Sequence, residues 1–131
     1  MRRSGVAVVV ASLTLVVASC SAAPDPQPEP EPLAVYSRTG YGMDALLEGT
    51  LRVVDGCVVV GSGESPTTIP MFPSDDAAWD AETDELIWKG ERYGDGDPIS
   101  LGGGSVGTEG IEGSYLPEAC KGDEIFLVSP F

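Results

Sequence analysis

Histidine is absent from this 131-residue chain, and basic residues are few. Seven Lys and Arg stand against 21 Asp and Glu, which gives a formal net charge of −14. Without histidine the chain cannot build a Ser-His-Asp or Cys-His catalytic arrangement, and it lacks a usual zinc ligand. Because nucleic acids are bound mainly through Lys and Arg, the composition predicts no nucleic-acid partner. It also makes electrostatic docking on anionic lipid unfavourable.

An apolar run long enough to cross a bilayer is also lacking. The charge-free apolar stretch 5–17 has about 13 residues, whereas a membrane-spanning helix needs roughly 20. Arg2 and Arg3 precede it, and this order of positive charge and short apolar run is typical of an export signal. We therefore expect residues 1–19 to be a signal peptide that is removed. The paired arginines leave the route open between general secretion and twin-arginine export.

The residues that end this stretch are Val17-Ala18-Ser19-Cys20. They resemble the lipobox of bacterial lipoproteins, in which an aliphatic residue and two small residues precede a cysteine. The resemblance implies that Cys20 becomes the first residue and carries lipid on its thiol. Two or three acyl chains anchor a protein stably, at about 0.8 kcal/mol per buried methylene. We expect a lipid anchor on the extracytoplasmic face of the cell membrane; an uncleaved apolar helix and ordinary secretion with cleavage near 22–23 are the alternatives.

A proline-rich segment separates the expected anchor from the rest of the chain. Proline occupies every second position from Pro24 to Pro32. Proline fixes φ and disfavours helix at the residue before it, so residues 20–32 should form an extended tether. At about 3.1 Å per residue, its nine alternating residues span roughly 28 Å. The alternative is a proline-rich ligand for a partner.

Residues 33–131 are predicted to form one small all-β domain. The clearest signal is a hairpin, in which β-branched runs at 51–54 and 57–60 flank the turn Asp55-Gly56. Further short strands are expected at 67–72, 85–89, 92–93, 98–101 and 124–128. About six strands favour a small antiparallel barrel or sandwich, and among these we favour an OB-type barrel. The Ser at 74 and the acids after it predict one helical turn over 74–79.

Cys57 and Cys120 remain as an even pair once Cys20 is acylated. In an oxidising compartment such a pair is expected to form a disulfide. Closing a loop of this length would stabilise the domain by about 4 kcal/mol in the chain-entropy model. The alternative is a redox-active pair, but the spacing lacks the C-x-x-C pattern of such pairs.

Six glycines fall between Leu101 and Ser114 and predict a mobile surface loop over 102–113. The segment has no lysine and no G-x-G-x-x-G that opens a helix, which argues against a phosphate-binding loop. A long loop of this kind could instead serve as a binding element.

The many carboxylates raise the question of calcium or of an acid-pair hydrolase. Asp80, Glu82 and Asp84 resemble the start of a calcium-binding loop, but Glu85 stands where such a loop needs glycine. We expect no metal site and keep these three as the candidates if one exists. Other oxygen clusters to consider are Asp75, Asp76 and Asp80, or Asp95 and Asp97. A hydrolytic acid pair needs a cleft that holds one carboxyl partly buried, and a domain this small offers little room for one.

The aromatic residues raise the further possibility of a sugar-stacking face, built from Trp79, Trp88, Tyr93, Tyr115 and Tyr41. Trp88 alternates with Leu86 along a predicted strand, which favours a place in the core for both.

The domain is also similar, loosely and over residues 48–128, to small lipoproteins of actinobacterial type with no assigned role. The features that carry this similarity are Gly49-Thr50-Leu51, Gly56-Cys57-Val58, Trp79, Gly90, Gly96-Asp97 and Cys120. The resemblance implies no catalytic or ligand residue. We therefore expect a non-enzymatic, lipid-anchored binding or accessory module for an envelope protein, without a cofactor. The alternatives are a lipoprotein that binds a small ligand, glycan or calcium, and then a hydrolase with an acidic pair.

Overall fold

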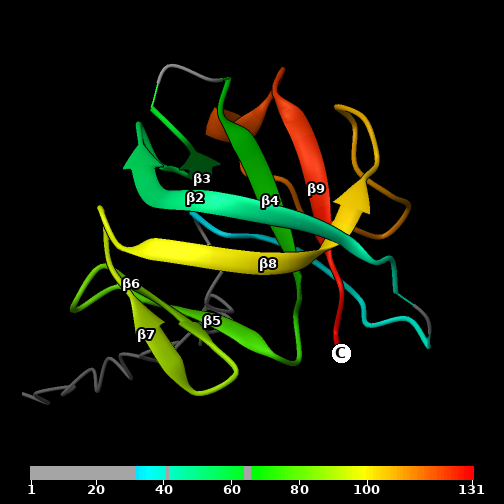
Figure 1. Ribbon diagram of the computed structural model, residues 1–131, viewed down its shortest axis with the longest axis horizontal. Coiled ribbons are helices and arrows are strands. Elements are labelled where there is room, and N and C mark those ends of the chain that lie inside the picture. The colour runs from blue at the N-terminus through cyan, green and yellow to red at the C-terminus, as the bar shows by residue number, and fades with distance from the viewer. Residues whose placement is uncertain (1–31, 41, 64–65) are drawn as a thin grey trace, which may run out of the picture.

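The computed structural model describes residues 32–40, 42–63 and 66–131, and these form an all-β domain (Figure 1). The predicted signal peptide, Cys20 and the tether before Pro32 lie outside the described residues. One 3-10 helix, η1 (Glu118–Cys120), accompanies the strands of the described part. The strands are β1 (Ala34–Tyr36), β2 (Ala45–Val54), β3 (Cys57–Gly61), β4 (Thr68–Pro73), β5 (Ala77–Asp80), β6 (Glu85–Trp88), β7 (Glu91–Tyr93), β8 (Pro98–Ser105) and β9 (Glu124–Val128).

Five strands close into a barrel. Strand β2 pairs with β3, β3 with β4, β4 with β9, β9 with β8, and β8 returns to β2. All of these pairs are antiparallel except β4–β9, which is parallel. Around the barrel the strands lie in the order β2-β3-β4-β9-β8. If the five are numbered by their place in the chain, this is 1-2-3-5-4, the order of an OB-type Greek-key barrel. The predicted fold class is confirmed.

The first barrel strand, β2, pairs with two different strands along its length. Its residues 45–50 pair with β8, and its residues 50–54 pair with β3. Gly49 lies where the two ladders meet, and a Cβ there would stand 2.7 Å from the carbonyl oxygen of Gly61. Glycine is therefore required at this position because the backbones approach too closely for any side chain.

The predicted hairpin is also confirmed. Val54 pairs with Cys57, and the two residues between them, Asp55 and Gly56, have φ of 49° and 85°. Two positive φ values in a two-residue loop define the turn whose twist matches antiparallel strands, and Asp-Gly is among its preferred sequences.

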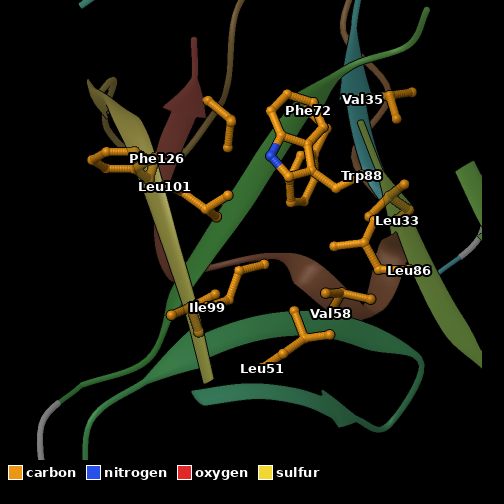
Figure 2. Packing of buried hydrophobic residues seen from close by; sticks show 12 residues of the cluster. Leu33, Val35, Leu51, Val58, Phe72, Leu86, Trp88, Ile99, Leu101 and Phe126 are labelled. Atoms are coloured by element: carbon orange, nitrogen blue, oxygen red, sulfur yellow. The ribbon is translucent and has the colours of Figure 1, made fainter. Parts of the chain in front are cut away.

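The barrel interior holds the first hydrophobic cluster. Alternate residues of each strand point inward, among them Leu51, Val58 and Leu101 (Figure 2). Strand β6 contributes Leu86 and Trp88 to the same cluster, and the Trp88 ring lies 5.1 Å from that of Phe72 between centroids. The core is thus completed by a segment inserted between two barrel strands.

That inserted segment is a three-stranded meander, β5–β6–β7, which lies below the barrel in Figure 1. The helical turn predicted over 74–79 is wrong. A turn bonded from the Asp76 amide to the Pro73 carbonyl (3.1 Å) comes first, and Ala77 then enters β5, which pairs with β6. Pairing with β6 gives the backbone its hydrogen bonds, and this outweighs the capping signal of Ser74.

A second hydrophobic cluster covers the outside of the barrel over β3, β4 and β9. It contains Ala34, Tyr36, Cys57, Val59, Ile69, Met71, Cys120 and Ile125. Strand β1 lies parallel to β4, and Val106, Ile111 and Leu116 from the segment after β8 pack against the cluster. Because its apolar side chains are used in this way, the segment 106–117 forms a packed cover over the barrel.

The predicted loop over 102–113 is therefore wrong in its first part. Gly102 to Gly104 belong to β8 and pair with β2 or β9. At Gly103 a Cβ would stand 2.0 Å from the carbonyl oxygen of Leu127, so the absence of a side chain is what lets β9 approach β8. Glycine richness here marks close backbone contact rather than a loop.

Candidate functional site

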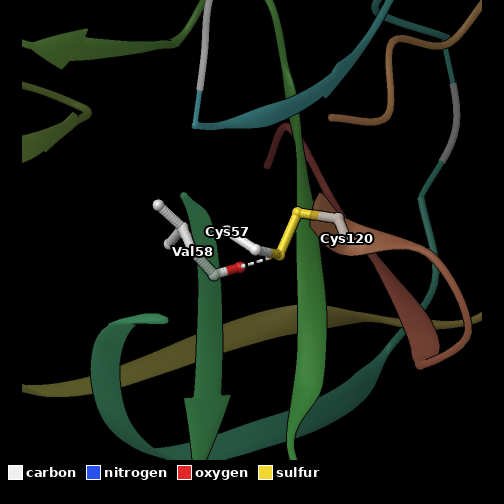
Figure 3. Close-up of a disulfide and its surroundings, with 3 residues drawn as sticks. All are labelled: Cys57, Val58 and Cys120. Carbon is white, nitrogen blue, oxygen red and sulfur yellow. Dashed lines mark hydrogen bonds between the residues drawn. A yellow bond between two sulfur atoms is a disulfide. The ribbon is translucent and has the colours of Figure 1, made fainter. Parts of the chain in front are cut away.

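Cys57 and Cys120 are joined by the predicted disulfide, with Cα atoms 5.2 Å apart (Figure 3). Both cysteines are buried, and the Val58 carbonyl oxygen lies 3.7 Å from the Cys57 sulfur. The bond links the start of β3 to η1. It therefore fastens the covering segment to the barrel, which is a structural role.

The calcium candidates Asp80, Glu82 and Asp84 do not come together as a ligand set. One carboxylate oxygen of Asp80 accepts a hydrogen bond from Arg92 Nη1 at 3.0 Å, and the other accepts from the Glu82 amide at 3.0 Å. The hydrogen bond from Arg92, followed by that from the Glu82 amide, lowers the pKa of Asp80. No group of three or more Asp, Glu or Cys side chains within residues 32–40, 42–63 and 66–131 is arranged to hold a metal ion.

Two of the other acidic candidates hold turns through hydrogen bonds. Asp95 accepts a hydrogen bond from the Val53 amide at 2.9 Å, and Asp97 accepts one from the Gly94 amide at 2.7 Å. Asp76 Oδ2 lies 3.7 Å from Arg38 Nε in an ion pair, and within the described part of the chain this buried oxygen has no hydrogen-bond partner. Asp95 and Asp97 therefore stabilise the loops that carry them.

The candidate stacking aromatics do not form an exposed face. Trp88 is buried, and Trp79, Tyr93 and Tyr115 are partly buried against the barrel core. Tyr41 lies outside the described residues. The hydroxyl of Tyr93 donates a hydrogen bond to Glu91 at 2.7 Å, and this bond, more than burial, raises the pKa of Tyr93.

The usual ligand face of an OB barrel is covered in this protein. OB barrels bind oligonucleotides and oligosaccharides on their second and third strands, which here are β3 and β4. The outward residues of these strands belong to the second hydrophobic cluster, against which the segment 106–117 packs. Strand β1 pairs beside β4 in the same sheet and adds Ala34 and Tyr36 to this cluster. Tyr36 of β1 is buried there and donates its hydroxyl hydrogen to the Val128 carbonyl. Burial, with a smaller contribution from Asp76, raises the pKa of Tyr36.

An exposed cavity of about 280 Å³ with a mixed polar and apolar lining lies instead beside the N-terminal end of β2, and we call it the apolar notch after its exposed side chains Met43, Leu46 and Phe131. Its lining residues are Gly42, Met43, Asp44, Ala45, Leu46, Gly102, Ser129 and Phe131. Leu46 and Gly102 are paired across β2 and β8. Ser129 fixes the segment before β2, because its hydroxyl accepts from the Met43 amide (2.9 Å) and donates to the Met43 carbonyl (2.8 Å).

This notch was not predicted from the sequence. Strand alternation places Leu47, Gly49 and Leu51 inward, and could therefore have marked Leu46 as an outward apolar residue. No comparable signal brings Met43 and Phe131 to it, because they meet only through the pairing of β8 with both β2 and β9.

Comparisons with protein-family models, curated proteins and solved structures found no match to the chain. Within the described residues, no helix is both long enough and apolar enough to span a membrane.

Proposed function

We propose that this chain is a lipoprotein anchored through Cys20 on the extracytoplasmic face of the cell membrane. Its OB-type domain acts as a binding or accessory module for an envelope protein. The lipobox-like end of the apolar stretch supports the anchor, and the proline-rich segment supports a tether that extends the reach of the domain.

The observation that carries the module assignment is the covering of β3 and β4. A barrel that bound a glycan or an oligonucleotide in the usual way would keep this face open. Here the segment 106–117 and the disulfide cover it, and β1, paired beside β4, adds Ala34 and Tyr36 to the buried cluster. The remaining surface offers an apolar notch, and exposed apolar surface on a stable scaffold supports recognition of another protein.

The test is crosslinking of the intact anchored protein in its own cells with a general amine-to-carboxyl reagent, followed by identification of the attached chains. The proposal expects one envelope protein at a yield comparable to that of the bait. The matched control is the same chain with Cys20→Ser, which should lose the anchor and most of this product. A broad mixture of abundant proteins, unchanged by Cys20→Ser, would contradict the module assignment.

A further inference from the structure

We propose that the apolar notch receives one large apolar side chain from a basic polypeptide segment of the envelope partner. This inference rests on the proposed function and identifies the surface that performs it.

Exposed apolar residues converge on this notch. Among the described residues, four large hydrophobic side chains are exposed, namely Met43 (39%), Leu46 (64%), Val54 (47%) and Phe131 (72%). Three of the four line the notch, whereas Val54 stands alone at the other end of β2. Apolar groups gathered around one hollow are typical of a protein-binding site, whereas single exposed apolar residues are ordinary.

The notch is built on fixed backbone. Its floor includes Gly102, where a Cβ would meet no atom within 4 Å, so the missing side chain leaves the floor open. Two positions along β8, the corresponding space above Gly104 is filled by Met43, whose sulfur would lie 2.5 Å from a Cβ there. Because β2 and β8 belong to the closed barrel, the floor needs no rearrangement before binding, which lowers the cost of association.

The openness of the notch favours a side chain over a free ligand. Pockets for small molecules bury most of the ligand, whereas this notch of about 280 Å³ opens to solvent. A second, enclosed space of about 50 Å³ adjoins it and shares Gly42, Met43 and Ser129 with it. Met43 lines both spaces, and its flexible side chain can shift to fit the incoming group.

Charge indicates that the partner segment is basic. Residues 33–131 carry 18 Asp and Glu but only five Lys and Arg. Three of these five, Arg38, Arg92 and Lys121, are in ion pairs with acids of the domain. Asp44 lines the notch itself, and Arg38, whose guanidinium lies 6.0 Å from the centre of the Phe131 ring, is already in an ion pair with Asp76. A basic segment is therefore attracted during approach, and an acidic segment or an anionic lipid headgroup is repelled.

Leu46, at the notch, lies toward the opposite end of β2 from the start of the described chain. The Pro32 carbonyl accepts a hydrogen bond from the Val58 amide, and Val58 pairs with Val53 of β2. Leu46 is seven residues from Val53, so the notch lies up to about 23 Å along the strand. In Figure 1 the described chain likewise starts beside β3, away from the end of β2 that begins the notch. An anchored domain can thus turn the notch away from the membrane.

The test places a small diazirine amino acid at position 46 of the full-length anchored protein and irradiates the living cells. The matched control carries the same amino acid at position 54, an exposed apolar site on the same strand. We expect an adduct from position 46 that is at least roughly tenfold stronger than that from position 54. Its crosslinked peptide should contain a large apolar residue next to Lys or Arg. Leu46→Asp should reduce general crosslinking of the same partner by a similar factor, and Val54→Asp should not.

Other outcomes overturn the inference and are distinguishable from failure of the proposed function. If the general reagent captures one envelope protein but position 46 gives no adduct with it, the notch is not the binding surface and the module assignment stands. Adducts to lipid, or to a second copy of this chain, also overturn the proposal that the notch binds an envelope protein. If neither reagent captures a defined envelope protein, both proposals fail. Equal melting temperatures of Leu46→Asp and Val54→Asp exclude misfolding as the cause of any loss.

Discussion

At the residue scale, the adjacent glycines of β8 differ in a way that their sequence does not show. A Cβ at Gly103 would stand 2.0 Å from the Leu127 carbonyl oxygen, whereas one at Gly102 would meet nothing within 4 Å. Forcing a methyl group against backbone should make Gly103→Ala destabilising by about 1–3 kcal/mol. Gly102→Ala, the matched control, should change stability by less than about 0.5 kcal/mol. Urea unfolding of both variants measures the difference, and equal midpoints would show that β9 does not approach β8 this closely.

The ion pair of Asp80 with Arg92 predicts a small, pH-dependent contribution to stability. The hydrogen bond from Arg92 lowers the pKa of Asp80 below its ordinary value of 3.8, so folding favours the charged carboxylate. The contribution is therefore fully present above pH 3.8 and is lost as the pH falls through the lowered pKa.

Asp80→Asn should accordingly lower the melting temperature slightly at pH 7, and the variant should converge with the wild type in strong acid. Salt should reduce the difference, because the pair is exposed to solvent. Asp84→Asn, in the same β5–β6 turn, is the control for removing one negative charge. A deficit for Asp80→Asn that widens on acidification would contradict the assigned role.

At the element scale, the disulfide holds the covering segment to the barrel. It joins residues 63 positions apart, and a loop of this length predicts about 4 kcal/mol of stabilisation. The double variant Cys57→Ala with Cys120→Ala should unfold at a much lower urea concentration. Wild-type protein treated with a reductant should approach the same midpoint, and it serves as the control for the lost side-chain packing. An unchanged midpoint in both would show that the bridge is not needed to keep the segment in place.

The strands that the sequence predicted are those with a local signal. The hairpin around Asp55-Gly56 carries its own turn chemistry, and the β-branched run of β3 follows directly. Strands β1 and β5 have no such signal, because they form by pairing with β4 and β6. The same reason explains the wrong prediction at Ser74, where the local sequence favours a helix cap but the chain that follows pairs with β6.

The candidate site was less predictable than the fold for a related reason. Individual acids could be listed from the sequence, but their use in turns and ion pairs depends on distant partners such as Arg92. The apolar notch combines residues near 43, 102 and 130, which only the closed barrel brings together. A cysteine pair could be predicted because the expected acylation of Cys20 leaves two of the three cysteines, so no geometry was needed.

At the scale of the whole molecule, the strong negative charge and the proposed anchor have to be considered together. After removal of 1–19 the chain would keep five basic residues against 21 acids. Such a chain is repelled by anionic membranes, so the lipid on Cys20 would have to supply all of the membrane affinity. The same repulsion would hold an anchored domain away from the bilayer, at a distance set by the proposed tether.

Loss of the proposed anchor should therefore release the protein from the membrane. Cys20→Ser should move it from the membrane fraction to the soluble fraction and abolish its labelling by a fatty-acid analogue. Ser19→Ala, which keeps a small residue before the cysteine, is the matched control. It should leave the membrane association and the fatty-acid labelling unchanged. Because charge contributes no attraction, the wild type should resist a high-salt wash, and Cys20→Ser should stay soluble even at low ionic strength. Retention of Cys20→Ser on membranes at low salt would show that the domain binds the surface by itself, contrary to the proposed anchor.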